Sequence, residues 1–134
     1  MSKKAKSINF IIPLQVYPFD VMVSVSQTDK QLTKSLDPYK KNLLESDYGL
    51  ASYPSSTTEA RAVLFSNKAS LIRLRKLPTE AHGFGTLAHE IFHIVTFVMD
   101  LAGMKLEVMV SDEAYAYLVG YLTENIYKEL NKHY

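Results

Sequence analysis

The sequence predicts an α+β fold, with strands in its first half and two long helices in its second half. Short β-branched runs occur at 8–12 and 21–26, and two further apolar runs follow at 62–65 and 71–75. From about residue 80 onwards, apolar residues recur every three or four positions, which is the period of an amphipathic helix. The chain has 134 residues, 47% of them hydrophobic, so we expect one domain over 1–134 with one buried core.

The four strand-like runs are expected to form a small, mostly antiparallel sheet. Pro18 separates the first two runs, which should pair with each other. Ser66-Asn67-Lys68 is a turn-forming segment between the last two, which predicts a hairpin. In the second strand of this hairpin, Arg73 and Arg75 alternate with apolar residues and should therefore lie on the opposite face of the sheet.

A less regular segment lies between the two strand pairs. Leucines from Asp29 to about Glu45 indicate a helix, which Asp37-Pro38 is expected to split. The next segment, 48–58, contains glycine, proline and a Ser/Thr cluster, and this composition predicts a surface loop.

The second half predicts two helices packed on the sheet. The first should begin between 79 and 86 and end at Gly103, a residue type that commonly stops helices. The second should begin after Ser111, a favourable N-cap, and continue to near Leu130.

Composition restricts the possible partners and locations. The formal charge of +1 predicts no nucleic-acid partner, and Lys3, Lys4 and Lys6 are expected to form a solvated tail. No stretch approaches the roughly 20 apolar residues of a membrane span, and no signal peptide is recognisable, so we expect a cytoplasmic protein without a membrane partner. The sequence does not fix the oligomeric state.

Cysteine is absent, which excludes disulfides, cysteine-bound metals and thiol catalysis. Any metal ion must therefore be held by nitrogen and oxygen atoms.

An HExxH motif, His89-Glu90-Ile91-Phe92-His93, lies within the first long helix. Two histidines at i and i+4 are about 40° apart around a helix and one turn along it, so both imidazoles can reach one ion. This geometry suits Zn²⁺. Glu90 should lie beside the pair, where its carboxylate can contact a water on the ion without binding the ion itself. The motif predicts a zinc site with Glu90 as general base.

A catalytic zinc site usually has three protein ligands and one open position, so a third ligand is needed. The other histidines, His82 and His133, do not have a typical third-ligand spacing. Metzincins carry a histidine six residues past the second one, where this chain has Met99, so that family is excluded.

The segment after the motif resembles that of gluzincins such as thermolysin, which supply a glutamate from a following helix about twenty residues past the second histidine. Glu113 is twenty residues past His93, within Ser-Asp-Glu-Ala-Tyr-Ala-Tyr. The resemblance implies that Glu113 is the third ligand. Acidic residues are also common in the first turn of any helix, and the weaker alternatives as ligand are Asp112, Glu107 and Asp100.

The resemblance covers about 60–130 and departs from thermolysin in two respects. Tyr117 stands where thermolysin has an aspartate that orients a zinc-bound histidine, and the carboxy-terminal domain of thermolysin has no counterpart. The chain thus looks like a minimal zincin-like domain, with an active-site helix followed by a ligand helix. It is also similar, more weakly, to the ImmA/IrrE group and to small zincin-like proteins of phages and bacteria.

The resemblance implies a zinc metallopeptidase acting on a peptide or protein substrate. Glu90 would accept a proton from water and pass it to the leaving amine. In zincins a sheet-edge strand pairs with the substrate, and 62–65 is the expected strand here. The oxyanion donor is left open among His82, Tyr115, Tyr117 and Tyr121, although the tyrosines also fit simple helix packing. The alternative function is a non-catalytic metal-binding or protein-interaction module on the same scaffold.

Overall fold

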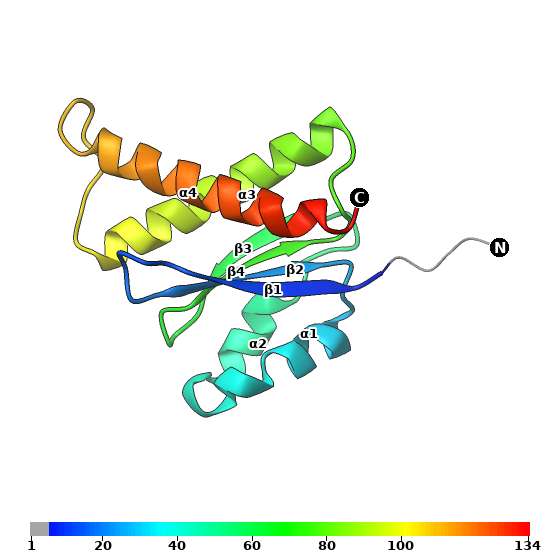
Figure 1. Ribbon diagram of the computed structural model, residues 1–134. Coiled ribbons are helices and arrows are strands. Elements are labelled where there is room, and N and C mark those ends of the chain that lie inside the picture. The colour runs from blue at the N-terminus through cyan, green and yellow to red at the C-terminus, as the bar shows by residue number, and fades with distance from the viewer. Residues whose placement is uncertain (1–5) are drawn as a thin grey trace.

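The computed structural model describes residues 6–134 and has three layers, with a four-stranded sheet between two groups of helices (Figure 1). The strands are β1 (Ile8–Pro13), β2 (Asp20–Val25), β3 (Ala60–Leu64) and β4 (Ser70–Leu74). One face is covered by α1 (Asp29–Ser35), a 3-10 helix (Asp37–Asn42) and α2 (Glu45–Ala51), and the other by α3 (Ala81–Leu101) and α4 (Asp112–Asn131). The predicted α+β class is confirmed.

The sheet is mixed, with the strand order β1-β2-β4-β3. Both predicted strand pairs form, since β1 pairs with β2 and β3 pairs with β4, each antiparallel. The central pairing of β2 with β4 is parallel. A parallel neighbour requires a crossover connection, and α1, α2 and β3 lie within the chain that makes it.

Apolar side chains form a separate layer on each face of the sheet. The larger layer lies under the two long helices and includes Val23, Ile72, Leu87, Ile91, Ile94, Val98, Leu118, Leu122 and Ile126. The smaller one lies under the short helices and includes Met22, Leu32, Leu36, Val63, Phe65 and Leu71. Both faces of the central strands are therefore buried, which explains their nearly continuous apolar sequences.

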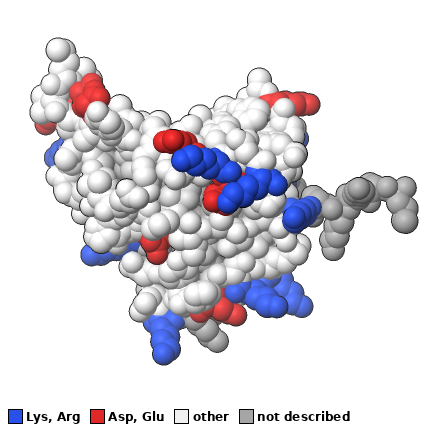
Figure 2. All heavy atoms as spheres, viewed as in Figure 1, with Lys and Arg blue, Asp and Glu red and all other residues white. Residues whose placement is uncertain are grey.

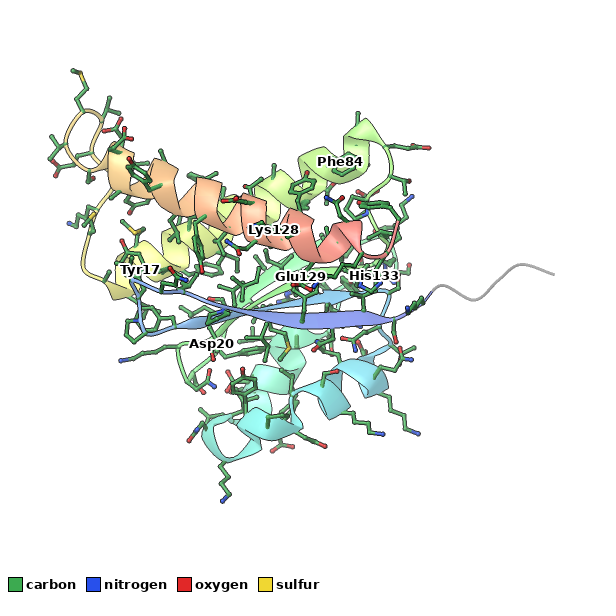
Figure 3. The ribbon with its side chains drawn as sticks, in the orientation of Figure 1. Tyr17, Asp20, Phe84, Lys128, Glu129 and His133 are labelled. Atoms are coloured by element: carbon green, nitrogen blue, oxygen red, sulfur yellow. The ribbon has the colours of Figure 1, made fainter. Side chains whose placement is uncertain are left out.

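The two long helices contact each other as well as the sheet. Near the start of α3, Phe84 stacks on Tyr127 of α4, with ring centroids 5.8 Å apart (Figure 3). By length and composition alone, α3 could cross a membrane, contrary to the sequence-based expectation. Its apolar side chains instead pack on the sheet and on α4, as in the core helix of a globular domain.

Charged side chains of both signs are interspersed on the face shown in Figure 2. On α4, Lys128 lies 3.6 Å from Glu124 and Lys132 lies 3.0 Å from Glu129. Lys3 and Lys4 of the expected basic tail lie outside the described residues.

The prediction of a loop over 48–58 is wrong at its start, because α2 continues to Ala51. The helix is held by Asp47, a buried carboxylate that accepts hydrogen bonds from the Leu44 amide at 2.7 Å and from the Ser66 amide at 3.0 Å. The Ser66 hydroxyl also donates to it, at 2.5 Å. These partners lie on both sides of the helix in sequence, so pattern reasoning could not anticipate them.

Arg73 lies on the predicted face of β4, but that face is covered by helices, and the residue is only 2% exposed. Its guanidinium donates to Asp29 at 2.6 Å and to the carbonyl oxygens of Ala51 and Gln27, each at 2.9 Å. A buried charge is tolerated when it is paired and hydrogen-bonded. Arg73 therefore ties the start of α1 and the end of α2 to the sheet.

Asp47→Asn should destabilise the fold by about 2 kcal/mol, because the charged hydrogen bonds to Leu44 and Ser66 are weakened. Burial raises the pKa of Asp47, but the hydrogen bonds from Ser66 and Leu44 outweigh it and hold the pKa below its usual value. A lowered folded-state pKa means that this stabilisation is present above about pH 4 and is lost as the pH falls further.

Urea denaturation of both proteins from neutral to acid pH measures the effect. The gap between the wild type and Asp47→Asn should shrink as the pH falls below about 4. A gap that stays constant over that range would contradict the assignment.

Candidate metal centre

The packing of α3 decides which of its residues face outwards. Leu87, Ile91, Ile94 and Val98 are buried against the sheet and α4, at the spacing of one helical face. The side chains of His89 and His93 lie on the opposite side and are exposed. The apolar period of the helix thus leaves the two histidines on one open face, as the motif predicted.

The two imidazoles converge. Nε2 of His89 and Nε2 of His93 are 3.0 Å apart, and the ring centroids are 4.7 Å apart with an interplanar angle of 70°. Two nitrogen ligands about 2.0–2.1 Å from a tetrahedral zinc ion would lie about 3.3 Å from each other. The spacing of the ring nitrogens is therefore close to that of two ligands of one ion.

Glu90 lies at the border between the buried and the open face, and it is 8% exposed. Burial raises the pKa of its carboxyl group, and the charges of His89 and His93 oppose this rise. Within residues 6–134, no protein group donates a hydrogen bond to the carboxylate. An acid without a protein partner, held close to two imidazoles, is suited to exchange a proton with a water at the site.

Glu113 is exposed and lies in the first turn of α4, which is the predicted element and position. The structure does not bring it to the histidine pair. Across the described part of the chain, no three or more His, Asp or Glu side chains form a group that could hold a metal. The same holds for the alternatives Asp112, Glu107 and Asp100, so the third ligand stays a prediction.

Ser111 is the N-cap residue of α4, as expected, but its side chain does not cap the helix. The hydroxyl accepts a hydrogen bond from the Glu107 amide at 2.8 Å and donates to the Lys105 carbonyl. It therefore orders the loop between α3 and α4. The amides of the first turn are left without a side-chain cap. Their partial positive charge favours acidic residues there, so Glu113 can be explained by this effect as well as by metal binding.

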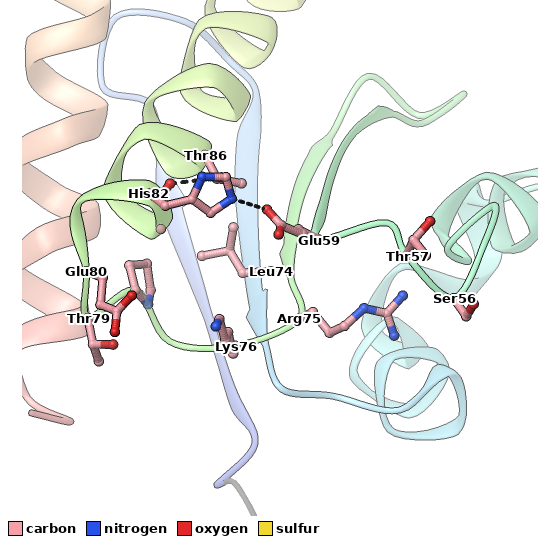
Figure 4. A pocket seen from close by; sticks show the side chains of 12 residues that line it. Ser56, Thr57, Glu59, Leu74, Arg75, Lys76, Thr79, Glu80, His82 and Thr86 are labelled. Carbon is pink, nitrogen blue, oxygen red and sulfur yellow. Dashed lines mark hydrogen bonds and ion pairs between the residues drawn. The ribbon is translucent and has the colours of Figure 1, made fainter.

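The four candidate oxyanion donors differ in their hydrogen-bond partners and in their exposure. Tyr115 donates to the Met104 carbonyl at 2.7 Å, and Tyr121 donates to the Pro13 carbonyl at 2.9 Å. Tyr117 is 74% exposed, so it does not pack between the helices as the simpler interpretation suggested. Nε2 of His82 lies 2.7 Å from Oε2 of Glu59, and both residues line a cavity at the start of α3 (Figure 4).

The strand next to α3 is β3, which lies at the edge of the sheet. The Arg75 amide donates to the Glu59 carbonyl, and the Phe65 amide donates to the Ala69 carbonyl. In an antiparallel pair, hydrogen-bonded positions alternate with free ones, so residues 61 and 63 also bond to β4. The N–H and C=O groups of residues 60, 62 and 64 therefore point to the open edge.

One residue beside the histidines was missed by sequence reasoning. The ring of Phe97 stacks on that of His93, with centroids 6.3 Å apart and an interplanar angle of 22°. The signal was its position four residues after His93, which places the two side chains on one face of the helix.

No protein-family model, curated protein or solved structure matches the chain. A functional assignment therefore depends on the geometry of the site itself.

Replacement of His89 or His93 by Ala should weaken zinc binding by more than the roughly 10–100-fold typical of losing an outer-shell partner. Isothermal titration with Zn²⁺ measures this effect. The matched control is His82→Ala, an exposed histidine on the same helix that contacts Glu59 instead of the pair. Equal losses in all three variants would show that zinc binds elsewhere or non-specifically.

Proposed function

We propose that the protein is a zinc-dependent peptidase in which His89 and His93 hold the metal, Glu113 completes the ligand set and Glu90 is the general base. The observation that carries this proposal is the 3.0 Å approach of the two Nε2 atoms beside the carboxylate of Glu90, which accepts no protein hydrogen bond in residues 6–134. Two imidazoles and a nearby acid are the groups that metal-assisted hydrolysis requires.

The donor set fits zinc better than harder cations. Imidazole nitrogen suits zinc, whereas magnesium and calcium prefer oxygen ligands, and the chain has no cysteine to offer sulfur. A zinc ion held by this pair would lower the pKa of a water towards neutrality and polarise a substrate carbonyl. Glu90 would accept the proton of that water and donate it to the leaving amine.

The third ligand belongs to the proposal because two histidines alone leave a zinc site under-coordinated. Glu113 is at a helix start directly after the loop that Ser111 orders. Its carboxylate is exposed and has no ion-pair partner among the described residues, so it is available for a metal. We assign it on the spacing from His93 and not on proximity.

The fold is proposed to be a minimal zincin-like domain. Three observed features support this: an antiparallel hairpin precedes the motif helix, the edge strand β3 lies beside that helix, and a second long helix follows. In this arrangement the free groups of residues 60, 62 and 64 would pair with an extended peptide, which agrees with the strand expected from the sequence.

The second function to be tested is a non-catalytic metal-binding or interaction module on the same scaffold. It is favoured by one observation, namely that no carboxylate joins the histidine pair in a three-residue group within residues 6–134. The two functions differ in their need for Glu90, because a pure binding module has no use for a buried general base.

Glu90→Gln should retain bound zinc but lose about 10²–10⁴-fold in peptide hydrolysis, the usual contribution of a general base. Metal content is measured on the purified protein, and turnover is measured on a broad peptide library. Glu124→Gln on the exposed face of α4 is the matched control and should leave both unchanged. Stoichiometric zinc in a wild type that cleaves nothing would favour the non-catalytic module.

Glu113→Gln should weaken zinc binding by at least about tenfold, because a neutral amide replaces a charged ligand. The neighbouring Asp112→Asn removes a charge from the same helix turn, so it is the control for charge and also tests Asp112 as the alternative ligand. If both variants lose the same affinity, Glu113 acts only through its charge and is not a ligand.

A further inference from the structure

A cavity of about 520 Å³ lies beside the histidine pair, between the end of β3, the second half of α3 and the loop that follows α3. Its apolar walls are Leu64, Phe97, Met104 and Leu106, and Asp100 and Lys105 also line it. This size is within the range of sites that take small ligands or single side chains. The cavity is therefore large enough for a bulky apolar group.

The cavity shares a wall with the candidate metal centre. Phe97 lines the cavity and stacks on His93. A group bound in the cavity next to Phe97 is therefore separated from the His93 imidazole by the Phe97 ring. The outer wall is held in place, because the Tyr115 hydroxyl donates to the Met104 carbonyl and Ser111 fixes the loop at Glu107. The pocket is thus preformed and does not depend on binding to order it.

The edge strand indicates what kind of molecule reaches the cavity. Leu64 ends β3, its side chain lines the cavity, and its N–H and C=O groups point to the open edge of the sheet. A ligand that uses both features must have a backbone that pairs with β3 and a side chain that turns towards Phe97. An extended peptide satisfies both requirements.

The opposite end of β3 has different chemistry. Glu59, which directly precedes the strand, lies in a second cavity of about 310 Å³ with Arg75, Lys76 and His82 (Figure 4). Both cavities contain charged and hydroxyl groups, but large apolar side chains are more numerous in the first, which has Leu64, Phe97, Met104 and Leu106. A peptide along β3 would therefore meet the first cavity at Leu64 and the second at Glu59, five residues or about 17 Å away at about 3.3 Å per residue.

Two apolar side chains of the cavity wall are partly exposed to solvent. Leu106 is 49% exposed and Met104 is 37% exposed, although both line it. A large apolar side chain would cover them and recover the free energy of removing that surface from water.

We propose that this cavity is a specificity subsite for a large apolar side chain of a peptide that binds in extended form along β3. The assignment rests on the proposed peptidase function. Antiparallel pairing is the more stable arrangement, and it places the amino-terminal part of the peptide at the Leu64 end. The apolar residue therefore precedes the bond that is cut.

Binding is tested with the 134-residue chain without added metal, because this readout does not require turnover. The chain has no tryptophan, so a single tryptophan in the peptide is the only indole signal. The probes are two capped heptapeptides of Gly, Ser and Thr, with tryptophan near the amino end in one and near the carboxyl end in the other. The first should bind about tenfold more tightly, and its emission should shift to the blue, since only it can pair along β3 with its indole in the cavity.

Leu106→Ser should weaken binding of the first peptide by about tenfold. Val108→Ser is the matched control, because Val108 is in the same loop and 80% exposed but does not line the cavity. Both positions are exposed, so neither substitution should unfold the protein. Equal effects of the two substitutions, or equal binding of the two peptides, would overturn the proposal.

Cleavage of a random peptide library by the zinc-loaded wild type separates this subsite from the proposed function. Cut sites should carry Phe, Leu, Met, Tyr or Trp on the amino-terminal side, and Leu106→Ser should reduce that preference. Cleavage with no such preference refutes the subsite and leaves the peptidase intact. Leu106-dependent binding with no cleavage of any peptide refutes the peptidase and supports the cavity as a peptide-binding site.

Discussion

The packing of α3 on the β3–β4 hairpin is the constraint on which the rest of the structure depends. Four apolar side chains at helical spacing, from Leu87 to Val98, must face the sheet and α4, and this fixes the rotation of the helix about its axis. Once that rotation is fixed, His89 and His93 have to point outwards and Glu90 has to lie at the border. Ala60 and Ala62 on β3 contribute to this contact, since their small side chains pack against the layer under α3. The geometry of the site is thus a consequence of core packing, and a shift of one residue in the helix register would move the histidines off the open face.

Glu90 is the residue at which packing and chemistry are in conflict. Its carboxyl group is mostly removed from water and accepts no hydrogen bond from the protein. The charged form is therefore destabilised, and the pKa of Glu90 is raised. Asp47 is the informative contrast, since it is at least as buried, yet its pKa is lowered by bonds from Ser66 and Leu44. The carboxylate of Asp47 has its hydrogen bonds satisfied by the protein, and its role is to stabilise the fold. No described residue donates a hydrogen bond to Glu90, so its carboxylate is available to a water or a ligand.

The sequence predicted those parts of the fold that depend on local periodicity. The strand pairs, both long helices and the stop at Gly103, whose φ of +76° suits glycine, follow from patterns within one segment. It failed where distant segments decide the outcome. Arg73 is buried because α1 and α2 supply its partners, and α2 itself forms around a carboxylate bonded to Ser66, nineteen residues away. At the site, the spacing within the motif predicted that the two histidines converge, because one helix contains both. The position of Glu113 depends on how two helices and a loop pack together, which no single-segment pattern determines.

The two edges of the sheet adjoin different helices, and this difference bears on function. An exposed edge can pair with other chains, so natural proteins usually cover or interrupt it. At the β1 edge, Pro13 ends the strand and its carbonyl accepts a hydrogen bond from Tyr121 of α4. At the β3 edge, the backbone groups of residues 60, 62 and 64 have no such partner among the described residues, although this edge lies beside the histidine pair. No proline interrupts β3, and the charge that this strand carries, Arg61, points to the other face of the sheet, where it donates to the Ser52 carbonyl. The backbone groups of residues 60, 62 and 64 therefore stay available for pairing next to α3, and we interpret this edge as a binding surface.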